Sequence, residues 1–221
     1  YADLACISLG GVTLGVYPTS PYPEVKYVVI HSDSVIIVCE DQEQTDKILE
    51  VIDDLPLLKK IIVKDMKGLR NYPKDIIISF REVEELGRQL LKTQPNFFLN
   101  EVNKGNCEDI CIMIYTSGTT GQPKGAMVNH LNVEATAWAS ADAMEISQND
   151  TVVSYLPLCH VAEQIFSLYL PLFVGNTVNF AESIATIQED LREIAPTVFL
   201  GVPRIWEKLH SSITIKIQDS S

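Results

Sequence analysis

The segment from Tyr115 to Gly125, written YTSGTTGQPKG, gathers the residue types best suited to chemistry in this chain. Glycine adopts positive φ without steric cost, so consecutive backbone N–H groups can form a concave nest for an anion. Hydroxyl groups add neutral hydrogen-bond donors, and one lysine supplies a compact positive charge. These residue types therefore predict a phosphate-binding loop. Its members are Thr116, Ser117, Gly118, Thr119, Thr120, Gly121, Lys124 and Gly125.

An ordinary surface turn uses the same residue types. Two features argue against that interpretation: an apolar run of strand length, residues 110–115, precedes the loop, and its single cation lies near the far end. The P-loop pattern G-x-x-x-x-G-K-[ST] requires a lysine directly after glycine. Here Pro123 precedes Lys124 and Gly125 follows it, so the segment is a poor match to a P-loop kinase or GTPase.

The elements that must position this loop alternate between strands and helices. Apolar runs of strand length alternate with amphipathic stretches of helical period, which predicts an α/β fold with mostly parallel sheets flanked by helices. The run at 34–39 has the continuous apolar character of a strand buried on both faces. Strands are expected at 12–17, 34–39, 60–63, 76–79, 110–115, 126–128, 151–155, 177–180 and 197–200. Helices are expected before residue 10 and at 24–32, 42–55, 82–92, 131–144, 161–173, 187–194 and from about 203.

The polar stretch 93–107 reads as a linker, and it divides the chain into predicted subdomains at 1–105 and 106–221. Three segments each follow a predicted strand: 117–124, 156–160 and 201–204. Ligands of parallel α/β sheets bind at the carboxyl ends of strands, so these segments are expected to line one crevice.

Composition excludes some functions. A net charge of -12, from 17 basic and 29 acidic residues, opposes a nucleic-acid backbone, so nucleic acid is not an expected partner. No apolar run approaches the ~20 residues that span a bilayer, and the first residues lack the features of a signal peptide. They resemble the second half of a helix, which suggests that the chain begins within a domain. Five scattered cysteines favour reduced thiols, and hence a cytoplasmic setting.

At this point the sequence resembles a known family. YTSGTTGQPKG is similar to the phosphate-binding signature of the adenylate-forming (AMP-binding) superfamily. YLPLCHVAE at 155–163 and VPRIWEK at 202–208 are similar to its long-chain acyl-CoA synthetase branch. The resemblance implies a part of the large N-terminal domain of the acyl-CoA synthetase fold, inactive alone because the family's mobile C-terminal domain and its catalytic lysine lie elsewhere.

The resemblance also implies an activity: ATP-dependent conversion of a long-chain fatty acid to its acyl-adenylate and then to acyl-CoA. ATP, Mg²⁺ and coenzyme A are the implied cofactor and substrates. Peripheral membrane contact and the oligomeric state stay open, as do a non-catalytic nucleotide-binding module and an enzyme for an aryl or amino acid. In this interpretation Thr116, Ser117, Gly118, Thr119, Thr120, Gly121 and Lys124 hold the phosphates, Thr116 contacts Mg²⁺ through them, and Lys124 and His160 are catalytic.

Other candidates depend less on the resemblance. Without it, His160 reads as a helix-start residue bonded to a nearby carbonyl group. Glu163, one helical turn later, is interpreted either as a partner that orients the imidazole or as a solvent-exposed glutamate. Arg204 either meets an anion or pairs with a glutamate, and Trp206 is expected in the core. The remaining histidines have no such context and read as structural or surface residues: His31, His130 and His210.

Overall fold

The computed structural model describes residues 1–116 and 122–219. The chain divides into two compact units, Tyr1–His130 and Leu131–Ser221, and each is described by itself. β5, Ile110–Thr116, lies in the first unit and pairs with β1, Thr13–Leu14. The subdomain boundary predicted after residue 105 stays a prediction.

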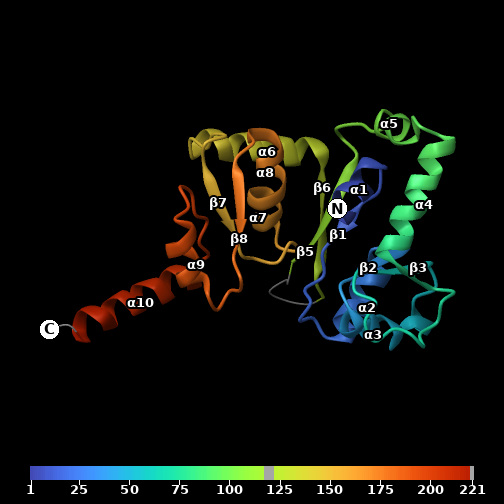
Figure 1. Cartoon of the computed structure of the whole chain (residues 1–221), viewed down its shortest axis with the longest axis horizontal. Coiled ribbons are helices and arrows are strands. Elements are labelled where there is room, and N and C mark those ends of the chain that lie inside the picture. Colours follow the sequence, from blue (N-terminus) through green and yellow to red (C-terminus); the bar gives the residue numbers. More distant parts are fainter. Residues whose placement is uncertain (117–121, 220–221) are drawn as a thin grey trace. The chain divides into compact units, whose positions relative to one another are not determined.

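The first unit contains two three-stranded sheets with helices around them (Figure 1). The strand orders are β1-β5-β6 and β2-β3-β4, and every pairing is parallel except that of β5 with β6. The elements are α1 (Ala2–Ser8), β1 (Thr13–Leu14), α2 (Tyr22–His31), β2 (Ile36–Cys39), α3 (Gln42–Leu49), the 3₁₀ turn η1 (Ile52–Asp54), β3 (Lys60–Val63), β4 (Ile77–Ser79), α4 (Phe80–Thr93), α5 (Phe97–Val102), β5 (Ile110–Thr116) and β6 (Lys124–Asn129).

The core of this unit lies between the β2-β3-β4 sheet and helices α2 and α3. Ile61 and Val63 of the central strand are fully buried in it. β2 corrects an expectation: it is an edge strand of its sheet, and Ile36 and Val38 are exposed on one face. The apolar run that predicted burial on both faces is therefore half covered within the described chain. The predicted linker 93–107 also contains a short helix, α5.

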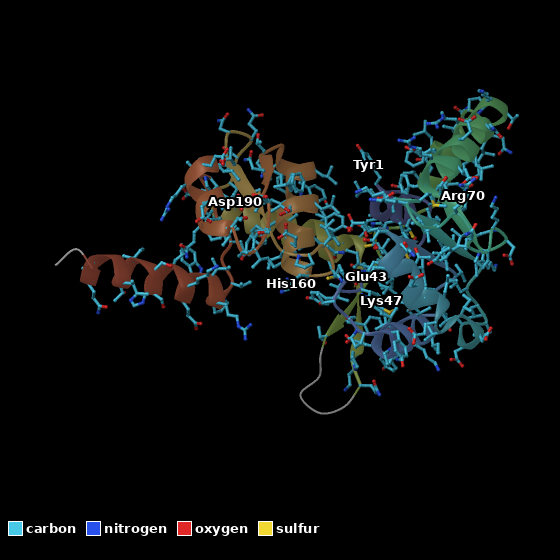
Figure 2. All side chains as sticks on the ribbon, turned by 60° about the horizontal axis from the view of Figure 1, so that its bottom comes forward. Tyr1, Glu43, Lys47, Arg70, His160 and Asp190 are labelled. Atoms are coloured by element: carbon cyan, nitrogen blue, oxygen red, sulfur yellow. The ribbon has the colours of Figure 1, made fainter. Side chains whose placement is uncertain are left out.

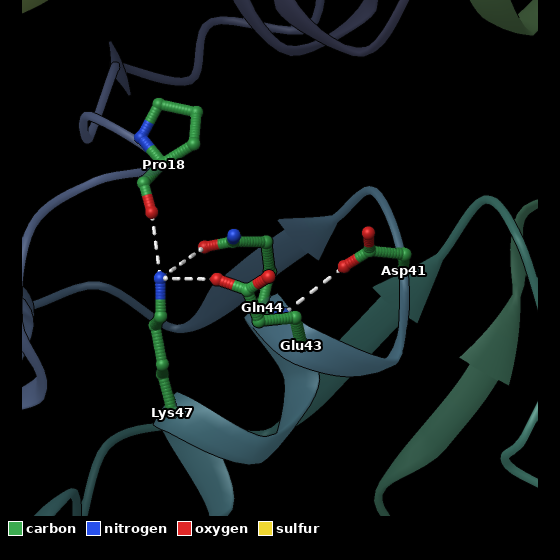
Figure 3. Close-up of polar contacts among 5 residues, drawn as sticks. All are labelled: Pro18, Asp41, Glu43, Gln44 and Lys47. Carbon is green, nitrogen blue, oxygen red and sulfur yellow. Dashed lines mark hydrogen bonds and ion pairs between the residues drawn. The ribbon is translucent and has the colours of Figure 1, made fainter.

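Lys47 of α3 holds the turn that precedes α2 (Figure 3). The ammonium group of Lys47 donates to the carbonyl oxygen of Pro18 at 2.6 Å and lies 3.1 Å from the carboxylate of Glu43. The carboxylate of Asp41 caps α3 by accepting a hydrogen bond from the backbone N–H of Gln44 at 3.1 Å. Together these contacts tie the turn that leads into α2 to a capped neighbouring helix.

The second unit is built on the parallel pair β7 and β8. Two clusters of buried apolar side chains form its core, one around Leu170 and one around Ile187. The strand predicted at 197–200 is reduced to a single bridge between Val152 and Val198. The elements are α6 (His130–Ala143), β7 (Thr151–Ser154), α7 (Val161–Glu163), the π-helical segment η2 (Gln164–Tyr169), α8 (Leu170–Val174), β8 (Thr177–Phe180), α9 (Ile187–Ile194) and α10 (Pro203–Asp219).

The predicted α/β class with mostly parallel sheets is confirmed. Strand β3 and helix α9 have the predicted bounds. The helix predicted at 161–173 is present, but its centre is a π-helix, which no periodicity argument anticipated. Among the described residues, no helix is both long enough and apolar enough to cross a bilayer.

Candidate functional site

The predicted phosphate loop begins and ends on two paired strands. β5 ends at Thr116 and β6 begins at Lys124, and these two residues face each other in the antiparallel ladder. Both are exposed. The other predicted phosphate ligands, Ser117, Gly118, Thr119, Thr120 and Gly121, lie outside the described residues. The structure therefore brings together the hydroxyl-bearing and the ammonium-bearing ends of the predicted loop.

Lys124 is exposed at the start of β6. Over residues 1–116 and 122–219, no carboxylate forms an ion pair with its ammonium group. An exposed lysine without an acidic partner keeps its three N–H donors for an external anion.

Gly125 has a different role from the one its place in the motif predicts. It lies inside β6, and its φ is not among the positive values. A Cβ atom there would lie 2.9 Å from the sulfur of Met113 and 3.3 Å from Cζ of Tyr115 on the paired strand. The missing side chain thus makes room for the Tyr115 ring across the ladder, and Gly125 does not bend the chain around an anion.

His160 caps the N-terminus of α7 and is labelled in Figure 2. Its Nδ1 accepts a hydrogen bond from the backbone N–H of Ala162 at 3.2 Å. The expected bond to a carbonyl group is therefore replaced by one to an N–H group. Because Nδ1 is an acceptor, the ring hydrogen must reside on Nε2. The half-buried side chain thus offers one N–H donor to a ligand oxygen.

Glu163 matches neither interpretation drawn from the sequence. It is only 3% exposed, and its carboxylate does not contact the imidazole. One carboxylate oxygen accepts from the hydroxyl of Ser154 at 2.5 Å, and the other accepts from the backbone N–H of Leu156 at 3.1 Å. Glu163 therefore ties the helix that begins after His160 to the end of β7 and to Leu156 of the connecting segment.

Tyr155 joins two of the three segments predicted to share a crevice. Its hydroxyl donates to the carbonyl oxygen of Leu200 at 3.0 Å and accepts from the N–H of Val202 at 3.1 Å. Burial raises the pKa of the Tyr155 phenol; the hydrogen bond from Val202 opposes this rise, and the Glu163 charge adds to it. In the second unit, the histidine segment and the 201–204 turn therefore start side by side. The third segment belongs to the first unit, so the shared crevice stays a prediction.

We expect Tyr155→Phe to destabilise the second unit. The substitution keeps the ring but leaves the Leu200 carbonyl and the Val202 N–H without their partner. The free energy of unfolding, measured by urea denaturation, should fall by about 1–3 kcal/mol. Tyr22→Phe is the matched control, because the side chain of Tyr22 is exposed. An equal, small effect of both substitutions would contradict the bridging role.

The remaining candidates near the second unit's strand ends lie at the surface. Arg204 is exposed and forms no ion pair with Glu207 within the described chain. Trp206 is 52% exposed, so the core position predicted for it is wrong. Its indole N–H donates to the carbonyl oxygen of Gly201 at 2.8 Å, and its ring meets Phe199 edge-on. Trp206 therefore braces the turn and does not fill the interior.

Solved structures of two adenylate-forming enzymes share this fold. The long-chain-fatty-acid-CoA ligase FadD1 from Archaeoglobus fulgidus matches with a TM-score of 0.69 at 19% identity, over 96% of this chain and 39% of that one. The adenylation domain of a carboxylate reductase from Mycobacterium chelonae matches with a TM-score of 0.70 at 20% identity, over 99% and 35%. The fold is thus that of part of an adenylate-forming enzyme.

The family follows from the sequence comparison. The chain matches the model of the AMP-binding enzyme family over residues 1–220, and it belongs to that family. It is 36% identical to the long-chain-fatty-acid–CoA ligase ACSBG2 of Xenopus laevis over 219 residues, covering 96% of this chain and 29% of the relative. The human ACSBG2 is 35% identical, with 95% and 31% covered, and the ACSBG1 of Bos taurus is 36% identical, with 96% and 30% covered. The chain therefore spans about a third or less of these relatives' length.

Proposed function

We propose that the chain is part of an ATP-dependent ligase that activates a long-chain fatty acid, first as an acyl-adenylate and then as acyl-CoA. A carboxylate oxygen forms a bond to the α-phosphorus of ATP while the bond to pyrophosphate breaks. The thiol of coenzyme A then replaces AMP on the acyl carbon. The observation that carries the proposal is the similarity to long-chain-fatty-acid–CoA ligases over nearly the whole chain.

The geometry supports roles for two described residues at the reacting phosphates. Lys124 offers an unpaired ammonium group to the departing pyrophosphate, which gains negative charge as it leaves. His160 offers a single Nε2–H donor, which suits a carboxylate or α-phosphate oxygen. Residues Ser117 to Gly121 complete the phosphate contacts in this proposal.

Mg²⁺ belongs to the proposal through Thr116. This ion prefers oxygen ligands and is usually held by one or two protein groups together with substrate phosphates. The exposed Thr116 side chain, across the ladder from Lys124, provides one such oxygen. Among the described residues, no group of acidic, histidine or cysteine side chains could hold a metal ion. When bound with the nucleotide, the ion would neutralise phosphate charge.

The test is ATP–pyrophosphate exchange by the full-length protein, with palmitate, anthranilate or an amino acid as the carboxylate. We expect palmitate to stimulate exchange about tenfold or more over the others, because only a long chain fills an apolar acyl site. Stronger stimulation by anthranilate or by an amino acid would show that the substrate is an aryl acid or an amino acid and not a long-chain fatty acid. No exchange with any acid would favour a non-catalytic nucleotide-binding module.

A further inference from the structure

Helix α2 presents two aromatic side chains to the strands that begin and end the phosphate loop. Tyr27 and His31 are four residues apart, so they lie on the same face of the helix. Val25 and Val29 of the same helix are buried in the core of the first unit. One face of the helix is thus packed into the core, and the opposite face carries Tyr27 and His31.

Tyr27 and His31 form hydrogen bonds on opposite sides of the predicted loop. The Tyr27 hydroxyl donates to the carbonyl oxygen of Pro123 at 2.8 Å, one residue before Lys124. Nδ1 of His31 is hydrogen-bonded to the Tyr115 hydroxyl at 2.7 Å, one residue before Thr116. These contacts connect residues 96 and 84 positions apart in sequence. One helix therefore holds β5 through Tyr115 and the residue that precedes β6, both next to the loop.

Ring packing reinforces the two hydrogen bonds. The Tyr27 and His31 rings meet Tyr115 at nearly perpendicular angles, 87° and 81°, with centroid distances of 6.5 and 5.7 Å. Edge-to-face contacts of this kind favour one mutual orientation. Gly125, opposite Tyr115, leaves the space that this ring occupies. Because both the hydrogen bonds and the ring contacts depend on direction, they restrict the position of β5 relative to α2.

We propose that Tyr27 and His31 are positioning residues that hold Thr116 and Lys124 ready for the phosphates of ATP. The inference rests on the proposed function, in which Thr116 and Lys124 contact the phosphates of ATP. A lysine on a free strand would lose more conformational freedom when it binds, and that loss would weaken binding. By holding the Pro123 backbone on one side of the loop and the Tyr115 side chain on the other, α2 removes part of this cost before the nucleotide arrives.

The test compares single hydroxyl deletions in the full-length protein. Tyr27→Phe removes the bond to Pro123, and Tyr115→Phe removes the bond to His31, while both keep their rings. Tyr72→Phe is the matched control: its hydroxyl donates to Asp46 at 2.6 Å and accepts from Gln42 at 2.8 Å, and these contacts join the loop before β4 to α3 in the same unit. ATP–pyrophosphate exchange gives the KM for ATP, the KM for palmitate and kcat.

We expect each of the two loop-side variants to raise the KM for ATP about three- to tenfold, the loss that follows from one hydrogen bond. The KM for palmitate and kcat should stay within about twofold. Backbone amides of β5 and β6 should exchange hydrogen about three- to tenfold faster in Tyr27→Phe, whereas Tyr72→Phe leaves them unchanged. A merely structural role would lower kcat and thermal stability without separating the two KM values.

Lys124→Ala in the same assay separates this inference from the proposed function. If Lys124→Ala slows exchange about 100-fold but Tyr27→Phe and Tyr115→Phe behave like Tyr72→Phe, the positioning role is overturned and the phosphate site stands. If Lys124→Ala leaves exchange unchanged, the phosphate site itself fails. Unchanged amide exchange in Tyr27→Phe would overturn the positioning role whatever the kinetics.

Discussion

Lys124→Ala should slow ATP–pyrophosphate exchange by the full-length protein about 100-fold, the usual cost of removing one preorganised donor from a developing negative charge. The physical reason is that the departing pyrophosphate gains charge in the transition state. Within the described chain, no carboxylate neutralises this lysine. The loss should appear mainly in kcat, because the interaction strengthens as the bond to pyrophosphate breaks.

A matched control uses another exposed lysine next to a strand. Lys64 follows β3, and its ammonium group lies 3.8 Å from the carboxylate of Glu40, with both side chains more than two-thirds exposed. Lys64→Ala should leave exchange unchanged. Lys124→Arg keeps the charge and should retain part of the activity. Equal rates for the Lys64→Ala and Lys124→Ala proteins would remove Lys124 from the phosphate site.

Glu163→Ala should destabilise the chain by about 2–4 kcal/mol, because two buried donors lose their acceptor at once. These donors are the hydroxyl of Ser154 and the backbone N–H of Leu156. The same change releases the segment that leads to His160. The free energy of unfolding, from urea denaturation of the 221-residue chain, measures the first effect. Exchange activity of the full-length protein, assayed well below its melting temperature, measures the second.

Two further variants identify the cause of the loss. Glu163→Gln keeps an oxygen for the Leu156 N–H, and its amide can donate to the Ser154 hydroxyl, so it should cost about 1 kcal/mol or less. Glu189→Ala removes an exposed carboxylate on α9 and should change stability by less than about 0.5 kcal/mol. If the Gln variant lost as much as the Ala variant, charge and not hydrogen bonding would explain the effect.

Local patterns in the sequence predict most of the elements, but not how much of each strand is covered. The short runs at 60–63 and 187–194 carry clear strand and helix periods, and their bounds are as predicted. The equally apolar run at 34–39 forms an edge strand, because burial depends on neighbours that a local pattern does not specify. For the same reason the run at 197–200 forms one bridge and no strand.

The candidate site shows the same division between local and long-range information. Residue types alone indicate the phosphate loop and its lysine, because that chemistry resides in one short segment. The contacts of Tyr27 and His31 join residues more than 80 positions apart, so no local motif could reveal them. Glu163 was noticed for its spacing from His160, yet its partners are Ser154 and Leu156. The position of a glutamate within a mainly apolar helical stretch was the available signal.

The π-helical segment Gln164–Tyr169 affects how this region tolerates change in length. A hydrogen bond that spans five residues includes one residue more than the α-helical bond, and each residue turns a helix by about 100°. A π-helical turn spreads the rotation of an α-helical turn over one more residue, so deleting one residue here would restore regular winding and leave the downstream elements in their present orientation. Leu170, which is fully buried and follows the segment, and His160, which precedes it, would both keep their places. An evolutionary gain or loss of a single codon in this stretch can therefore be absorbed by the winding of the helix, without redirecting the side chains on either side.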